Sequence, residues 1–170
     1  LRHTAEYQKL REALTAGRSP VALFGMPPAA RAQVAAALAS DLGRPAVILT
    51  AGEAAAVRFA SDAAFFGARS GVCPVRDFAL RPTLSQSHEF EYRRLAVLGN
   101  IVGGRCSLLA LPLEAALQHT VPRAEFEANT LTLKEGQTIK QQDLIARLVS
   151  AGYHRRDRVE GPGQFSVRGG

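Results

Sequence analysis

The sequence contains no tryptophan, a single methionine and only two cysteines among 170 residues. The cysteines, Cys73 and Cys106, lie in short apolar runs and not at the spacing of metal ligands or redox pairs. We expect both thiols to be reduced and packed in a core, because a free cysteine behaves as a small apolar residue. This pattern argues against a disulfide-stabilised protein and against a cysteine-based metal site.

Patterns of membrane and secreted proteins are also missing. No run approaches the roughly 18 apolar residues that a membrane-spanning helix needs. The initial segment, LRHTAEYQKL, lacks the apolar stretch of a secretory signal. We therefore expect a cytoplasmic protein that does not contact a membrane.

Catalytic motifs are equally scarce. The serines Ser85 and Ser87 lie in a polar stretch without the glycine pattern of a nucleophile elbow. The histidines are His3, His88, His119 and His154. They are dispersed, and no pair has the spacing of metal ligands. The sequence therefore predicts no catalytic site and no metal site.

The composition that remains is that of a basic globular protein. Hydrophobic residues make up 46% and charged residues 21%, which is enough for a core, and the length allows one domain or two small ones. The formal net charge of +6 suits an acidic partner. Nucleic acid and an acidic protein surface both fit, because charge alone does not distinguish them.

Helical and strand-like patterns alternate over the first 120 residues. Helical spacing of apolar residues predicts helices at residues 6–16, 53–66, 88–101 and 113–118, with an alanine-rich helix that ends at Gly43. Short apolar runs predict strands at residues 21–24, 45–50, 72–75 and 106–110. Such alternation is typical of a parallel sheet covered by helices. We therefore predict an α/β fold for residues 1–120.

Residues 121–170 follow a different pattern. A strand at 130–133 precedes a helix whose apolar stripe includes Leu144 and Leu148. Two further strands, at 155–159 and 164–167, flank the Gly161-Pro162-Gly163 segment, which favours a hairpin. We therefore predict a second, smaller α+β unit with a basic hairpin.

The turn after Gly25 occupies the position of a phosphate-binding loop. The pattern G-x-x-x-x-G-K-[ST] would place glycine, lysine and a hydroxyl residue where Ala30, Arg31 and Ala32 stand. Alanine resists the positive φ of an amide nest, and Ala32 offers no oxygen to Mg²⁺. The prolines at 27 and 28 remove two amide donors. We therefore predict a degenerate loop without a nucleotide.

From Thr130 the chain reads TLTLKEGQTIKQQDLIARLVSAGYHRRDRVEGPGQFSVRGG. This stretch resembles the UvrA-interaction domain shared by UvrB and the bacterial transcription-repair coupling factors. The matching residues are Leu131, Leu133, Gly136, Gln137, Asp143, Leu144, Leu148, Gly152, Tyr153, Asp157, Val159, Glu160, Pro162, Gly163, Phe165, Val167, Arg168, Gly169 and Gly170. Upstream, FEYRRLAVLGNIVGG and LLALPLEAALQ agree more loosely with the same families.

Two departures from UvrB favour the coupling factors. UvrB keeps a working phosphate loop and a tyrosine-rich hairpin that grips DNA. Here the Gly25 loop is degenerate, and the stretch PVRDFALRPTLSQSHEF has only Phe78 and Phe90 as aromatic residues. The resemblance implies a degenerate RecA-like scaffold, similar to the first domain of UvrB, in residues 1–120 and a UvrA-interaction unit in residues 121–170.

The resemblance also implies a function. The chain would be the amino-terminal module that recruits UvrA to stalled transcription sites in nucleotide excision repair, without hydrolysing ATP itself. ATP and Mg²⁺ would serve only motor domains, found elsewhere in such ATP-dependent DNA translocases, and DNA and RNA polymerase would bind through other parts. Because the families continue past the final glycines, we expect a fragment of a longer protein.

Arginines at the predicted hairpin are the candidate contacts with UvrA. The family arginines align with Arg155 and Arg168, while Arg156 and Arg158 would share one face of a strand. Phe165 would supply an apolar anchor or else pack beneath the hairpin. Two alternatives stay open: a UvrB-like module that binds nucleic acid through the same arginines, and a small nucleotide hydrolase.

Overall fold

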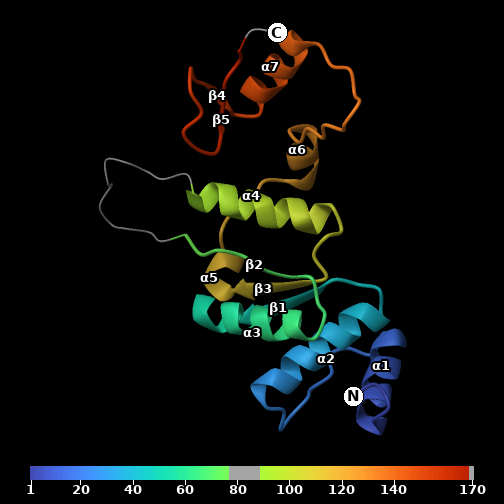
Figure 1. Ribbon diagram of the computed structural model, residues 1–170. Coiled ribbons are helices and arrows are strands. Elements are labelled where there is room, and N and C mark those ends of the chain that lie inside the picture. Colours follow the sequence, from blue (N-terminus) through green and yellow to red (C-terminus); the bar gives the residue numbers. More distant parts are fainter. Residues whose placement is uncertain (77–88, 169–170) are drawn as a thin grey trace. The chain divides into compact units, whose positions relative to one another are not determined.

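The computed structural model describes residues 1–76 and 89–168, and Figure 1 shows the arrangement of their helices and strands. The chain divides into two compact units, Leu1–Gln118 (unit 1) and His119–Gly170 (unit 2). Among the helices described, none is both long and apolar enough to cross a membrane.

Unit 1 is an α/β unit built on a parallel sheet, as the sequence predicts. Its elements are α1 (Ala5–Thr15), α2 (Pro28–Asp41), β1 (Ala46–Thr50), α3 (Glu53–Phe65), β2 (Ser70–Val72), α4 (Glu89–Val102), β3 (Leu108–Pro112) and α5 (Leu113–Ala116). The strand order is β1-β3-β2, and both neighbours run parallel to β3. In Figure 1, α3 and α4 lie on opposite sides of this sheet.

The core of unit 1 is formed by the central strand and small helical residues. Leu108 and Ala110 of β3 are fully buried, and Leu108 packs with Ala32 of α2 and Ala63 of α3. Alanine at these helix positions lets the helix backbones approach the sheet closely, while the apolar contacts exclude water. Both cysteines are free, as expected, and the thiol of Cys73 is buried.

Three strand predictions in unit 1 need correction. Residues 21–24 form no strand, and the side chain of Phe24 is 90% exposed. An apolar run becomes a strand only where a neighbour takes up its backbone hydrogen bonds, and prolines flank this run on both sides. The strands expected at 72–75 and 106–110 are displaced to β2 and β3, because their limits follow from mutual pairing. His88 lies outside the described residues.

Unit 2 consists of α6 (Arg123–Ala128), α7 (Gln141–Ser150), β4 (His154–Arg155) and β5 (Gln164–Phe165). The strand expected at 130–133 is absent, and α6, which begins after Pro122, was not expected. The two strands pair in parallel, so the predicted hairpin is wrong. None of the described residues of unit 2 is fully buried.

Candidate functional site

Unit 2 presents a set of exposed arginines in and beside its two short strands. We name them the arginine cluster; they are Arg155, Arg156, Arg158 and Arg168. Arg155 belongs to β4, the next two lie in the connection to β5, and Arg168 follows β5. No ion pair joins any of the four to a carboxylate within the described residues. Their charges are therefore available to a partner.

Backbone and side-chain hydrogen bonds hold the connection that carries these arginines. The amide of His154 donates to the carbonyl oxygen of Gly163, and that of Arg156 to Phe165, each at 2.9 Å. The hydroxyl of Ser166 donates to the carbonyl oxygen of Asp157 at 2.9 Å. Strand β4 includes only His154 and Arg155, so no strand continues over residues 156–159. The predicted alternation of faces over 155–159 is therefore wrong.

The apolar residues near the cluster differ from the expectation. The sequence allowed Phe165 to be either an exposed apolar anchor or a buried core residue. In the structure it lies in β5 and is half-buried. Tyr153, Val149 and Val159 are more exposed, with 41% of Tyr153 open to solvent. The sequence places Tyr153 and Val159 within the matching motif, but their exposure depends on the tertiary structure. They are the apolar candidates that sequence reasoning missed.

The loop at Gly25 leads directly into α2. Gly25 has a φ of 75°, but α2 begins at Pro28, so Ala30, Arg31 and Ala32 all lie in the helix. The Arg31 amide donates to the carbonyl oxygen of Pro27 at 3.2 Å, and its Nε donates to Met26 at 3.0 Å.

Each of these features has a chemical consequence. The residues that the phosphate-loop pattern would use lie in the helix, and the Arg31 side chain folds back onto the loop. Ala32 is fully buried and carries no oxygen for a magnesium ion. The described residues also hold no group of acidic, histidine or cysteine side chains suited to a metal.

The carboxyl edge of the sheet, where open α/β folds bind ligands, is occupied by a side chain. Arg94 of α4 donates to the sulfur of Cys73, just after β2, at 3.2 Å. It also donates to the carbonyl oxygens of Ala115 and Gln118, each at 3.3 Å. Burial raises the pKa of the Cys73 thiol, and the Arg94 charge opposes this shift. Arg94 is therefore a structural clamp between α4, β2 and α5, which the sequence did not indicate.

Comparisons with known proteins match both part of unit 2 and the whole chain. Residues 131–170 match the sequence model of a family described as the UvrB interaction domain. The whole chain is similar to the transcription-repair-coupling factor of Bacillus subtilis (strain 168), with 27% identity over 173 residues. A similar match, 26% over 175 residues and 94% of the chain, is found to UvrABC system protein B of Neisseria meningitidis (strain MC58).

A further relative is the transcription-repair-coupling factor of Staphylococcus aureus (strain USA300), which is 29% identical over 97 residues, or 57% of the chain. The matched regions make up 15% and 8% of the two coupling factors and 26% of the Neisseria protein. The resemblance predicted from the sequence is confirmed. Identities of 27% and 26% do not separate the two kinds of relative.

Proposed function

We propose that this chain is a docking module that recruits UvrA in nucleotide excision repair, as the amino-terminal part of a transcription-repair coupling factor. The observation that carries the proposal is the arginine cluster, whose four members are exposed, lack an ion-pair partner in the described residues and fall within the family match at 131–170. A basic surface of this kind fits an acidic face of a partner protein.

Arginine is suited to this contact for two physical reasons. Its planar guanidinium pairs with a carboxylate through two hydrogen bonds, which gives both strength and orientation. Arginine and aromatic residues also tend to carry most of the binding energy of an interface. The exposed ring of Tyr153 lies two residues before Arg155 and supplies an apolar contact beside the charges.

The choice of a coupling factor over UvrB is supported by the Gly25 loop. A helix that starts at Pro28 and an Arg31 side chain turned toward Met26 favour a scaffold without ATP hydrolysis of its own. The other departure, the lack of a tyrosine cluster around Phe78, falls mostly in residues 77–88, outside the described ones. DNA and RNA polymerase would bind through other parts of a longer protein.

The decisive experiment measures binding of the 170-residue chain to purified UvrA. We expect the Arg155→Ala/Arg168→Ala variant to bind at least about tenfold more weakly, because truncating interface anchors costs roughly 1–4 kcal/mol each. Arg123→Ala is the matched control, since Arg123 is exposed in unit 2 but precedes the matched segment and pairs with Glu127. Equal binding by the double variant and the control would remove these arginines from the interface.

A nucleic-acid-binding module is the second candidate, because the same arginines could neutralise phosphates. This reading predicts DNA binding by the isolated chain, with an affinity that falls steeply as salt rises. Measurements at several salt concentrations, with UvrA omitted, separate it from protein docking. The remaining alternative is a small nucleotide hydrolase, and calorimetric titration with ATP and Mg²⁺ tests it. Saturable micromolar binding would contradict our interpretation of the Gly25 loop.

A further inference from the structure

The connection between β4 and β5, residues 156–163, is bonded to two polar side chains that follow it in the chain. The amide of Glu160 donates to Oε1 of Gln164 at 2.9 Å, and the hydroxyl of Ser166 donates to the carbonyl oxygen of Asp157 at 2.9 Å. Gln164 and Ser166 are half-buried, whereas the connection is exposed as far as Glu160. The two side chains thus link the exposed connection to the half-buried segment that follows it.

The backbone alone fixes only the ends of this connection, where the amides of His154 and Arg156 are bonded. Between these ends, residues 157–162 make no backbone-to-backbone hydrogen bond in the described part of the chain. A loop without restraint must lose conformational entropy when a partner orders it, and this loss lowers the affinity. Gln164 and Ser166 supply the side-chain hydrogen bonds that restrain the connection.

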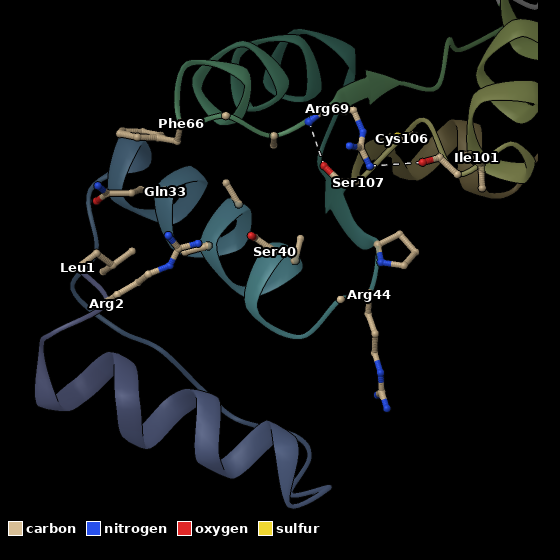
Figure 2. A pocket seen from close by; sticks show the side chains of 18 of the residues that line it. Leu1, Arg2, Gln33, Ser40, Arg44, Phe66, Arg69, Ile101, Cys106 and Ser107 are labelled. Atoms are coloured by element: carbon tan, nitrogen blue, oxygen red, sulfur yellow. Dashed lines mark hydrogen bonds between the residues drawn. The ribbon is translucent and has the colours of Figure 1, made fainter.

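A bond of the same type occurs in unit 1, where other contacts accompany it. The amide of Arg69 donates to the hydroxyl oxygen of Ser107 at 2.9 Å, which Figure 2 shows as a dashed line. These residues precede β2 and β3, which pair with each other and adjoin the buried core. Unit 2 has no fully buried residue in its described part. We therefore expect the conformation of its connection to depend more strongly on such bonds.

This restraint bears on the charges that the connection carries. Arg156 and Arg158 alternate there with the acidic residues Asp157 and Glu160. No ion pair joins these arginines to either carboxylate within the described residues. A connection free to rearrange would bring opposite charges together, and the arginines would then lose part of their attraction for a partner. Holding the backbone at Asp157 and Glu160 limits this self-pairing.

We propose that Gln164 and Ser166 are positioning residues of the docking surface, which fix the connection so that Arg156 and Arg158 are presented to UvrA before contact. This role rests on the proposed function, because the arginines are the binding groups there. Neither Gln164 nor Ser166 is among the residues that carry the family resemblance, so the motif alone does not indicate the role. Such preorganisation raises the affinity by reducing the entropy lost on binding, without adding a contact.

Binding of UvrA to variants of the 170-residue chain tests this role. Gln164→Met and Ser166→Ala should each bind about threefold to tenfold more weakly, which is the usual contribution of one hydrogen bond. Ser166→Thr, which keeps the hydroxyl, should bind as the wild type does. Ser150→Ala is the matched control, because the Ser150 hydroxyl also donates to a backbone carbonyl oxygen, that of Arg147 at 2.9 Å, but in α7.

A comparison of two backgrounds separates positioning from direct contact. In an Arg156→Ala/Arg158→Ala chain the charges to be positioned are absent, so Ser166→Ala should have almost no further effect on the affinity. A contact that Ser166 itself makes with UvrA, or general unfolding, would give the same loss in both backgrounds. Additive losses would therefore overturn the proposal.

Amide hydrogen exchange of the free chain, followed by NMR, tests the restraint without UvrA. Gln164→Met should speed exchange at Glu160 several-fold, because that amide loses its acceptor. Gln137→Met is the matched control, since Gln137 accepts a hydrogen bond from the Lys134 amide at 3.2 Å through the same side-chain oxygen. In this control, exchange should rise at Lys134 and stay unchanged at Glu160.

These measurements distinguish a failure of the positioning role from a failure of the proposed function. A wild-type chain that does not bind UvrA would contradict the proposed function and the positioning role with it. UvrA binding that depends on Arg155 and Arg168, but is equal for the wild type, Gln164→Met and Ser166→Ala, would overturn the positioning role alone. Unchanged exchange at Glu160 in Gln164→Met would overturn it as well.

Discussion

The two units of this chain use their side chains in opposite ways. Among the described residues, all the fully buried apolar ones lie in unit 1, where Leu108 and Ala110 meet alanines of α2 and α3. Unit 2 has no fully buried residue in its described part and exposes its arginine cluster. Burial of apolar area is the main favourable term in folding, whereas exposed charges add little to it. We therefore expect unit 1 to provide most of the stability and unit 2 to provide a surface for contact.

The sharpest test of this contrast is Leu108→Ala in the centre of unit 1. We expect it to lower the free energy of unfolding by about 2–5 kcal/mol, because it removes buried methyl groups and leaves a cavity. Urea denaturation followed by circular dichroism measures this loss. Leu117→Ala is the control, since Leu117 is 79% exposed. Similar losses for both variants would show that the core does not lie where we place it.

The clamp formed by Arg94 should matter nearly as much. Arg94→Met keeps much of the side-chain volume but removes the hydrogen bonds to Cys73, Ala115 and Gln118. We expect a loss of about 1.5–3 kcal/mol, the usual range for hydrogen bonds that involve a charged group. The Cys73 thiol should also react faster with a thiol-modifying reagent, because α4 would no longer be held against it. Arg93→Met is the exposed control, and an unchanged unfolding curve for Arg94→Met would refute the clamp.

The sequence predicts the elements that depend on local spacing. The expected ranges 53–66 and 45–50 agree closely with α3 and β1, because helical periodicity and continuous apolar runs are properties of the segment itself. The Arg94 clamp arises from residues about 21 positions apart, which no local pattern contains. The parallel pairing of β4 with β5 is likewise absent from the local pattern, and the sequence therefore failed to predict it. The Gly161-Pro162-Gly163 segment favours a turn but does not specify the direction of the strand that follows.

The candidate site was only partly predictable. The motif identified the arginines of unit 2, and their exposure follows from a unit too small to bury charged side chains. Whether Phe165 is an anchor or a core residue could not be read from alternation, because the strand ends after two residues. Pro122 followed by Glu125 was a usable signal for the start of α6, since proline and acidic residues favour a first helical turn.

A smaller effect is expected where α1 is held against α2. The Tyr7 hydroxyl donates to the Asp41 carboxylate at 2.7 Å, so Tyr7→Phe should cost about 1 kcal/mol. This bond lowers the pKa of Asp41 in the folded state. The contribution of the Asp41 carboxylate to the free energy of unfolding is therefore present above its ordinary pKa, and it is lost as pH falls through the pKa of the folded state. Burial and the same bond raise the pKa of Tyr7 to about 12. The contribution of the neutral Tyr7 hydroxyl to the free energy of unfolding is therefore lost as pH rises through that value.

Unfolding measured across the acid range checks the sign of this effect. The wild-type chain should lose more stability on acidification than Asp41→Asn, in which the titrating carboxyl is absent. Tyr7→Phe should show a weaker acid dependence than the wild type, because the hydrogen bond that lowers the Asp41 pKa is gone. Parallel curves for all three proteins would contradict a linked ion pair and hydrogen bond at this position.

The smallest change in stability is expected in unit 2. Arg155→Ala/Arg168→Ala should alter the free energy of unfolding by less than about 0.5 kcal/mol, because both side chains are exposed and without an ion-pair partner in the described residues. The same variant should lose most of its affinity for UvrA. Parallel measurements of denaturation and binding therefore test whether stability and recognition lie in different units. A double variant that unfolds as readily as Leu108→Ala would show that the arginines help to fold unit 2.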